Sequence, residues 1–257
     1  MMAEQVRLTL ERNETLARIV LDSPKGNVLT TTMVERVSAE LAKLEELRSV
    51  RLLTLEGGGP HFSFGASISE HAPGQVERML PAMHQMIRDL LDVPVPTAAV
   101  VQGRCLGGGF ELALACDFIF AADDAVIGVP EVALAAFPPA AAALLPPRLG
   151  YARATDAILT GATRPAAEWE QAGLVTRVVP RDRLDAEVGA WFDEHLAGRS
   201  ASGLRHAAAA ARFGLRKHVA RVLPDLERLY LNELMRTPDV TEAVTAFLAK
   251  RPPVWTD

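Results

Sequence analysis

Residues 103–117 read GRCLGGGFELALACD, and this stretch places three consecutive glycines immediately before an apolar run. The apolar run is typical of a buried helix, and glycines let the backbone before it approach another group closely. Free N–H groups point outward at the start of a helix, so negative charge is stabilised there. The segment therefore predicts a binding site at a helix N-terminus, with Glu111 in the first turn.

Three common glycine-rich or nucleophile motifs do not match. A phosphate-binding loop would continue from Gly108 with Lys and Ser or Thr, and here residues 109–110 are Gly and Phe. A dinucleotide fingerprint would need glycine in place of Leu112, and a nucleophile elbow would need glycine in place of Ser69. The six histidines are scattered without metal-ligand spacing, so no metal site is predicted. One candidate that fits is an oxyanion hole made of N–H groups, which stabilises a developing thioester enolate.

Two glutamates stand alone in apolar surroundings. Glu111 follows the glycines directly, and Glu131 lies in the segment GVPEVA twenty residues later. A carboxylate among apolar side chains is unfavourable unless it is paired or functional. The alternatives are a first-turn acid favoured by the helix dipole or a solvent-facing position for Glu111, and a loop cap after proline for Glu131. The repetition of the pattern suggests that the two acids share one site.

The surrounding pattern predicts an α/β fold. Polar and apolar residues alternate over residues 6–10, and an apolar run follows at 16–21, which is typical of a strand hairpin. Strand and helix patterns then alternate, and the chain after residue 181 reads as helices. Thr31 or Thr32 is the expected N-cap of the first helix. This first helix has apolar residues at 34, 37, 41 and 44. The other expected strands are 50–55, 97–101 and 175–179, and the other expected helices are 75–91, 184–196, 201–213, 219–235 and 240–249.

Composition narrows the function classes. The 257 residues are 49% hydrophobic and 23% charged, enough to bury the core of a large globular domain. A net charge of -5 provides no general field for nucleic acid or anionic lipid. The first residues lack the pattern of a secretory signal, the longest apolar stretch is interrupted by charge and proline, and Cys105 and Cys116 provide no disulfide framework. We expect a cytoplasmic protein that binds neither nucleic acid nor membrane.

Four segments carry a family resemblance: FGAS at 64–67, QGRCLGGGFELALACD at 102–117, PE at 130–131 and AFLAKR at 246–251. In this order and spacing they resemble the crotonase, or enoyl-CoA hydratase/isomerase, superfamily. The resemblance implies a spiral of ββα turns for residues 1–190 and a helical region at 191–257 used for assembly into a homotrimer or hexamer. It also implies an acyl-CoA thioester as substrate and no separate cofactor, because coenzyme A is part of the substrate.

The resemblance also implies roles for particular residues. The N–H groups of Ala66 and Gly108 would form the oxyanion hole, and Glu111 and Glu131 would be the catalytic acids, with Glu111 activating water and Glu131 donating a proton. The presence of both acids favours hydration or dehydration. The expected substrate- and CoA-binding residues are Lys25, Phe64, Gly65, Gly107, Phe247 and Lys250. The alternative for the last two is an amphipathic terminal helix with Phe247 in the core and Lys250 in water.

Departures from the family pattern bear on the substrate. Ser67 stands where many members have Asp, and AAFPPAAAALLP at 135–146 replaces a glycine-rich segment, which predicts a stiffer, apolar pocket wall. With HFSFGAS at 61–67, this tract most resembles the cyclohexa-1,5-diene-1-carbonyl-CoA hydratases. The alanines could admit a ring or pack a helix interior.

The alternative functions are an enoyl-CoA isomerase, another crotonase reaction or non-catalytic acyl-CoA binding. Further candidates for the pocket border, with a surface or core role as the alternative, are His61, Ser63, His71 and His84.

Overall fold

The computed structural model describes residues 5–24, 26–72 and 74–256. Its strands are β1 (Gln5–Glu11), β2 (Leu16–Asp22), β3 (Leu52–Gly57), β4 (Thr97–Val101), β5 (Arg104–Leu106), β6 (Phe118–Ala122), β7 (Val126–Gly128), β8 (Arg164–Pro165) and β9 (Arg177–Val179). Its α-helices are α1 (Thr31–Ala42), α2 (Val76–Asp92), α3 (Gly108–Ala115), α4 (Pro139–Leu149), α5 (Tyr151–Thr160), α6 (Ala166–Gln171), α7 (Leu184–His195), α8 (Ala201–Asn232) and α9 (Pro238–Leu248). Short 3₁₀ helices are η1 (Lys43–Glu45), η2 (Ile68–His71), η3 (Pro130–Leu134), η4 (Arg181–Arg183) and η5 (Leu234–Arg236).

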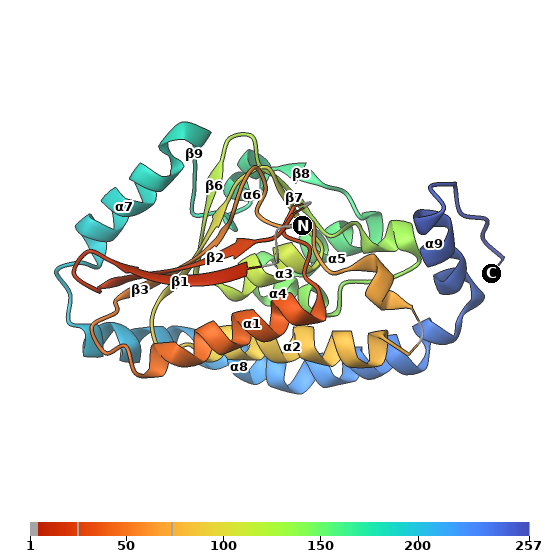
Figure 1. Cartoon of the computed structure of the whole chain (residues 1–257), viewed down its shortest axis with the longest axis horizontal. Coiled ribbons are helices and arrows are strands. Elements are labelled where there is room, and N and C mark those ends of the chain that lie inside the picture. The colour runs from red at the N-terminus through yellow and green to blue at the C-terminus, as the bar shows by residue number, and fades with distance from the viewer. Residues whose placement is uncertain (1–4, 25, 73, 257) are drawn as a thin grey trace.

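The main sheet has the strand order β1-β2-β3-β4-β6-β9 (Figure 1). β1 and β2 form an antiparallel hairpin, and the other neighbouring pairs run parallel. The expected hairpin and the expected alternation of strands and helices are therefore confirmed. A second sheet has the strand order β5-β7-β8. The chain passes from β5 into α3 and from β7 into η3. Since loops after parallel strands meet at one edge, this arrangement gathers segments distant in sequence.

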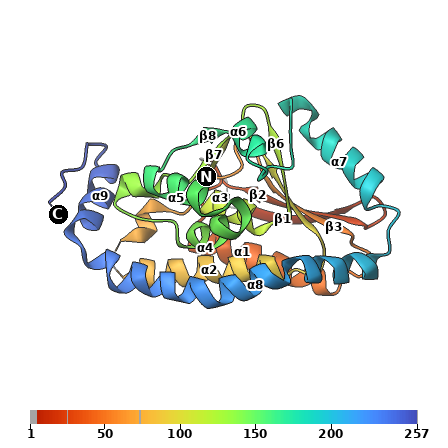
Figure 2. The same cartoon turned by 180° about the vertical axis from the view of Figure 1, so that it is seen from behind.

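Apolar residues on the two faces of the main sheet belong to two separate clusters. Adjacent residues along a strand point to opposite faces. Leu53 and Ala99 therefore join the large core formed with α1, α2, α3 and α4, whereas Leu52 and Ala98 join a smaller core formed with α7. Figure 2 shows α7 on one side of the sheet and α1, α2 and α8 on the other. The candidate site described below lies on the side of the larger core.

Helices α2 and α8 pack against each other along the side of the molecule opposite α7 (Figure 1). α8 also packs against α4, and α4 packs against α3. This chain of contacts links the C-terminal helix α8 to the glycine segment at the start of α3. The boundary expected after residue 190 falls inside α7, and the role of residues 191–257 in assembly stays a prediction.

Two local expectations were wrong. Thr30, rather than Thr31 or Thr32, caps α1: its side chain accepts a hydrogen bond from the amide of Met33, because the helix already begins at Thr31. The helices expected at 201–213 and 219–235 are one helix, α8. The cost of a mid-helix glycine is only about 1 kcal/mol, and buried side chains at Arg212 and Val219 continue the same packed face across Gly214.

Both cysteines, Cys105 and Cys116, are free and buried. Within the described part of the chain, no helix has the length and apolar character needed to cross a membrane.

Candidate active site

The glycine segment turns the chain from β5 into α3. Gly107 has a φ of 51°, a left-handed conformation that favours glycine, and α3 begins at the next residue. The amide of Glu111 donates to the Gly107 carbonyl at 2.9 Å, which closes the first turn. Gly108 is the first helical residue, so its N–H has no acceptor inside the helix. The expected helix start and the place of Glu111 in its first turn are confirmed.

A second loop brings another free amide to this point. Ala66 lies beside Leu29, and the two hydrogen bonds between these segments run from Leu29 N to Gly65 O and from Ser67 N to Leu29 O. The N–H of Ala66 points away from this pairing. A Cβ added to Gly108 would lie 3.2 Å from the Ala66 amide, so the two amides are neighbours. Among the described residues, neither amide has a hydrogen-bond acceptor. Two adjacent donors of this kind form a potential oxyanion site.

Glu111 is buried and held by the backbone of α4. Its side chain is only 6% exposed, and Oε1 accepts a hydrogen bond from the Ala141 amide at 2.8 Å. Burial raises the pKa of Glu111 above its ordinary value. The Ala141 bond, the charge of His84 and a bond from the Ala140 amide oppose this rise. The carboxylate form of Glu111 is therefore the form that its surroundings stabilise by hydrogen bonding.

Glu131 lies in the first turn of η3, next to Gly107. A Cβ added to Gly107 would lie 2.5 Å from Glu131 Oε1, so this carboxyl group packs against the glycine turn. Its Oε2 is buried and has no hydrogen-bond partner within the described residues. Burial, and next the negative charge of Glu111, raise the pKa of Glu131 to about 8. The structure thus brings the two acids together, and repulsion between them favours one shared proton.

Tyr230 of α8 was missed by the sequence analysis. Its side chain is 2% exposed, and its ring packs edge-on against Phe137 with centroids 5.2 Å apart. Burial and the charges of Glu131 and Glu111 raise the pKa of Tyr230. Its phenol therefore lies near both acids. The sequence offered no motif for it, because a tyrosine a hundred residues from Glu131 on an amphipathic helix has the pattern of an ordinary core residue.

The alanine-rich tract forms the N-terminal part of α4. Ala140, Ala141 and Ala143 are fully buried in the large core. These three alanines therefore pack a helix interior and do not line an open pocket, as one of the two expected alternatives proposed. The tract still borders the site through its backbone, because the Ala141 amide binds Glu111 and the half-buried Phe137 contacts Tyr230.

The residues expected to bind coenzyme A do not all lie beside the two acids. Phe64 is 43% exposed and covers Gly26, and its amide donates to the Gly26 carbonyl at 2.9 Å. Lys25 lies outside the described residues. α9 lies at one end of the molecule and α3 near its middle (Figure 1). Phe247 on α9 is 50% exposed, so its alternative role in the core is wrong. Lys250 is exposed, as the same alternative predicts. The apolar face of α9 buries Val240, Ala243 and Ala246 instead.

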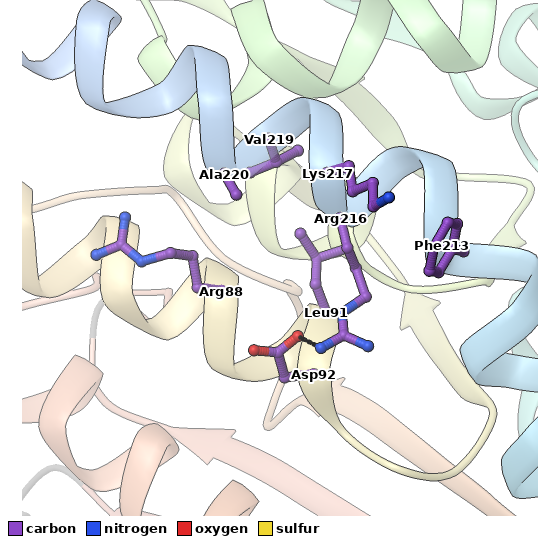
Figure 3. A pocket seen from close by; sticks show the side chains of 8 residues that line it. All are labelled: Arg88, Leu91, Asp92, Phe213, Arg216, Lys217, Val219 and Ala220. Atoms are coloured by element: carbon purple, nitrogen blue, oxygen red, sulfur yellow. Dashed lines mark ion pairs between the residues drawn. The ribbon is translucent and has the colours of Figure 1, made fainter.

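Two of the cavities formed by the described residues are relevant here, and both lie outside the cluster of acids. One, of about 720 Å³, adjoins the Phe64 loop and is lined by residues that include Asp22, Gly26 and His61. The other, of about 360 Å³, lies between α2 and α8 (Figure 3). There Arg216 of α8 forms an ion pair with Asp92 of α2 at 2.5 Å. Neither cavity is lined by Glu111 or Glu131.

Gly65 is expected to be irreplaceable even by alanine. Its φ is 91°, and an added Cβ would lie 2.6 Å from the Leu106 carbonyl oxygen. Gly65→Ala should lower the free energy of unfolding by about 1–3 kcal/mol for the conformation alone, with a further loss from the clash. Gly74→Ala is the matched control, because Gly74 has a φ of 84° and open space around its Cβ. Urea denaturation of both variants measures the difference, and equal losses would contradict the close approach.

Comparison with known proteins agrees with this fold. A family model described as enoyl-CoA hydratase/isomerase matches residues 11–257. A cyclohexa-1,5-dienecarbonyl-CoA hydratase from Thauera aromatica is 42% identical over 250 residues, which cover 97% of this chain and 96% of that protein. A probable enoyl-CoA hydratase from Rhizobium meliloti is 35% identical over 95% of each chain. The crystal structure of an enoyl-CoA hydratase from Mycobacterium avium subsp. paratuberculosis has a TM-score of 0.86 at 28% identity, covering 98% of both chains.

These similarities assign the chain to a class of enzymes that act on acyl-CoA thioesters. The chain belongs to the enoyl-CoA hydratase/isomerase family. The crotonase resemblance, the fold class and the expectation of a hydratase-type lyase are therefore confirmed.

Proposed function

We propose that the protein is an acyl-CoA hydratase that adds water to, or removes it from, a C=C bond conjugated to a coenzyme A thioester, and that its substrate is a cyclic dienoyl-CoA. The observation that carries the proposal is the pair of neighbouring acids, the buried Glu111 and the half-buried Glu131, next to the adjacent amides of Ala66 and Gly108. Hydration requires a base, an acid and a stabiliser of the enolate formed between the two proton transfers. This cluster contains all three.

In the proposed reaction, the thioester oxygen accepts hydrogen bonds from the Ala66 and Gly108 amides. Glu111 takes a proton from water as the water oxygen bonds to the alkene, and the π electrons move toward the thioester oxygen. Glu131 then gives its proton to carbon as the enolate collapses, so the product gains one water. Two contacts support this division of roles: the Ala141 amide donates to Glu111, whereas Glu131 Oε2 has no partner among the described residues.

The narrower substrate rests on two observations. The relative from Thauera aromatica that is 42% identical over nearly the whole chain is named a cyclohexa-1,5-dienecarbonyl-CoA hydratase. In addition, Tyr230 lies near the two acids and packs edge-on against the half-buried Phe137, and an aromatic wall of this kind packs well against a flat, unsaturated acyl group. A compact ring is therefore the acyl group that we favour over a straight chain.

Mass spectrometry tests the function directly. Purified protein is incubated with cyclohexa-1,5-diene-1-carbonyl-CoA and, separately, with crotonyl-CoA. We expect the cyclic thioester to gain the mass of one water much faster than crotonyl-CoA does. Faster conversion of crotonyl-CoA would contradict the cyclic substrate, and rearrangement of a double bond without a mass change would favour the isomerase alternative. Binding of both thioesters without turnover would favour a non-catalytic acyl-CoA-binding protein.

Hydration turnover is expected to fall as the pH rises through about 8. The pKa of Glu131 is raised to about 8, so its carboxyl group holds a proton at neutral pH and loses it above that value. If this proton goes to carbon, kcat/KM should fall roughly tenfold for each further pH unit. Initial rates at substrate concentrations well below KM, measured from neutral to alkaline pH, check this expectation. Circular dichroism at each pH controls for unfolding, and a flat profile would contradict the role of Glu131.

The path of the coenzyme A moiety is part of the same proposal. Gly65 and Gly107 shape the two turns at the thioester, and Phe64 adjoins the cavity near residue 26, where the pantetheine would leave the site. Phe247 and Lys250 would reach the nucleotide of a neighbouring subunit in a homotrimer or hexamer. Exposed apolar side chains around α9 support such assembly: Phe247, Leu248, Val254 and Trp255. Sedimentation of the purified protein as a monomer would contradict it.

A further inference from the structure

A buried histidine of α2, His84, lies near Glu111. His84 is 1% exposed, and α2 packs against α3 at this point. The neighbouring Met83 contacts the start of α3, since a Cβ added to Gly108 would lie 2.9 Å from Met83 Cε. The charge of His84 is among the factors that oppose the raised pKa of Glu111. His84 is therefore near the first turn of α3, although it belongs to none of the family segments.

Glu227 of α8 holds one side of this ring. His84 Nδ1 and Glu227 Oε2 are 2.6 Å apart. The bond to His84 is the first cause that lowers the pKa of Glu227, and the charge of Arg88 lowers it further, so Glu227 is a carboxylate at neutral pH. Arg88 is one turn from His84 on α2 and lines the cavity in Figure 3. A histidine fixed through Nδ1 presents Nε2 in a defined direction.

The other side of the ring has no protein partner. His84 Nε2 is buried and makes no hydrogen bond with any described residue. An unpaired polar nitrogen in a core is unfavourable, whereas such a group is common where a site handles protons or charge. Because Nδ1 is already occupied by Glu227, Nε2 is the nitrogen left to act on the site.

We propose that His84, held by Glu227, is a positioning residue of the active site that keeps the neighbouring Glu111 in its carboxylate form. This inference rests on the proposed function, in which Glu111 is the base. A positive charge on His84 lowers the energy of the carboxylate form of both Glu111 and Glu227. The proton shared by the two catalytic acids then resides on Glu131, where the proposed reaction needs it.

Several other groups act on Glu111, and each comes from a different element. The amides of Ala140 and Ala141 in α4 favour its carboxylate. Glu131 of η3 opposes ionisation by charge repulsion, and the phenol of Tyr230 lies near both acids from α8. In the part of the chain that the structure describes, His84 is the one side chain whose positive charge lowers the pKa of Glu111. Removing the charge of His84 should therefore raise the pKa of Glu111 measurably, even though the amide hydrogen bonds remain.

The test measures the titration of the Glu111 carboxyl group itself, so it does not depend on hydration activity. Protein labelled with ¹³C at glutamate side-chain carboxyl groups is titrated by NMR, and the Glu111 signal is assigned by its loss in Glu111→Gln. We expect His84→Gln to raise the midpoint of the Glu111 titration by on the order of one pH unit. Glu227→Gln, which keeps the histidine but removes its counter-ion, should raise it by less. His206→Gln is the matched control, because His206 is an exposed histidine of α8 bonded to the Ser202 carbonyl.

The outcomes separate this inference from the proposed function. An unchanged Glu111 midpoint in both His84→Gln and Glu227→Gln would overturn the inference, whether or not the protein hydrates thioesters. If His84→Gln does not fold, Glu227→Gln alone decides, since Glu227 lies at the surface with 25% of its side chain exposed. If the protein hydrates thioesters, the pH midpoint of the acid limb of the rate profile should rise in His84→Gln by the same amount as the NMR midpoint of Glu111. The rate at alkaline pH should change little. A uniform loss of rate at all pH values would instead indicate a purely structural role and overturn the inference.

Discussion

Glu111→Gln is expected to reduce the hydration rate by about 10²–10⁴-fold, the usual contribution of a positioned general base. Glutamine has nearly the same shape, and its amide oxygen can still accept the hydrogen bond that the Ala141 amide donates to Glu111. The substitution therefore removes the basic group while it preserves the contact between α3 and α4. Because burial of the Glu111 charge is unfavourable, the variant should be at least as stable as the parent protein.

Steady-state kinetics with the thioester that the mass-spectrometry experiment identifies measure this effect. Glu168→Gln is a suitable control, because Glu168 is an exposed residue of α6 in an ion pair with Arg164. The double variant of Glu111 and Glu131 should be little slower than Glu111→Gln alone, since the two acids act in one sequence of proton transfers. A normal rate in Glu111→Gln with an intact fold would show that another group activates water.

The local part of the candidate site could be predicted from the sequence. Glycines at 107–109 and the acid at 111 occur within one short segment, and their spacing alone determines a turn followed by a helix with Glu111 in its first turn. The hairpin of β1 and β2 is likewise determined by alternation over a few residues. Such features depend on neighbours along the chain, and local backbone preferences decide them.

Features that depend on distant segments could not be predicted in this way. The pairing of His84 with Glu227 joins residues 143 positions apart, and Tyr230 reaches the acids only because α8 packs against α4. The continuity of α8 also depends on packing, since buried side chains on both sides of Gly214 outweigh the local cost of glycine. Sequence periodicity indicates that a face is buried without indicating what it is buried against.

Arg212→Met is expected to lower the free energy of unfolding by about 3–5 kcal/mol, the usual loss when one partner of a buried ion pair is removed. Arg212 of α8 is 4% exposed, and its guanidinium donates to both carboxylate oxygens of Asp117 at 2.5–2.7 Å. It also donates to the carbonyls of Val93 and Val95, in the segment between α2 and β4. Methionine fills much of the volume but leaves the Asp117 charge and both carbonyls without this donor.

Arg216→Met on the next turn of α8 provides the comparison. Arg216 forms an ion pair with Asp92 at 2.5 Å, but both side chains are largely exposed, so its loss should cost less than about 1 kcal/mol. Urea denaturation of the two variants at one protein concentration measures the difference, and similar losses would contradict the argument from burial. Since Arg212 fixes α8 to the end of α2, the weakened variant should also loosen the contact between His84 and Glu227. The shift in the Glu111 titration should then appear in Arg212→Met and be absent in Arg216→Met.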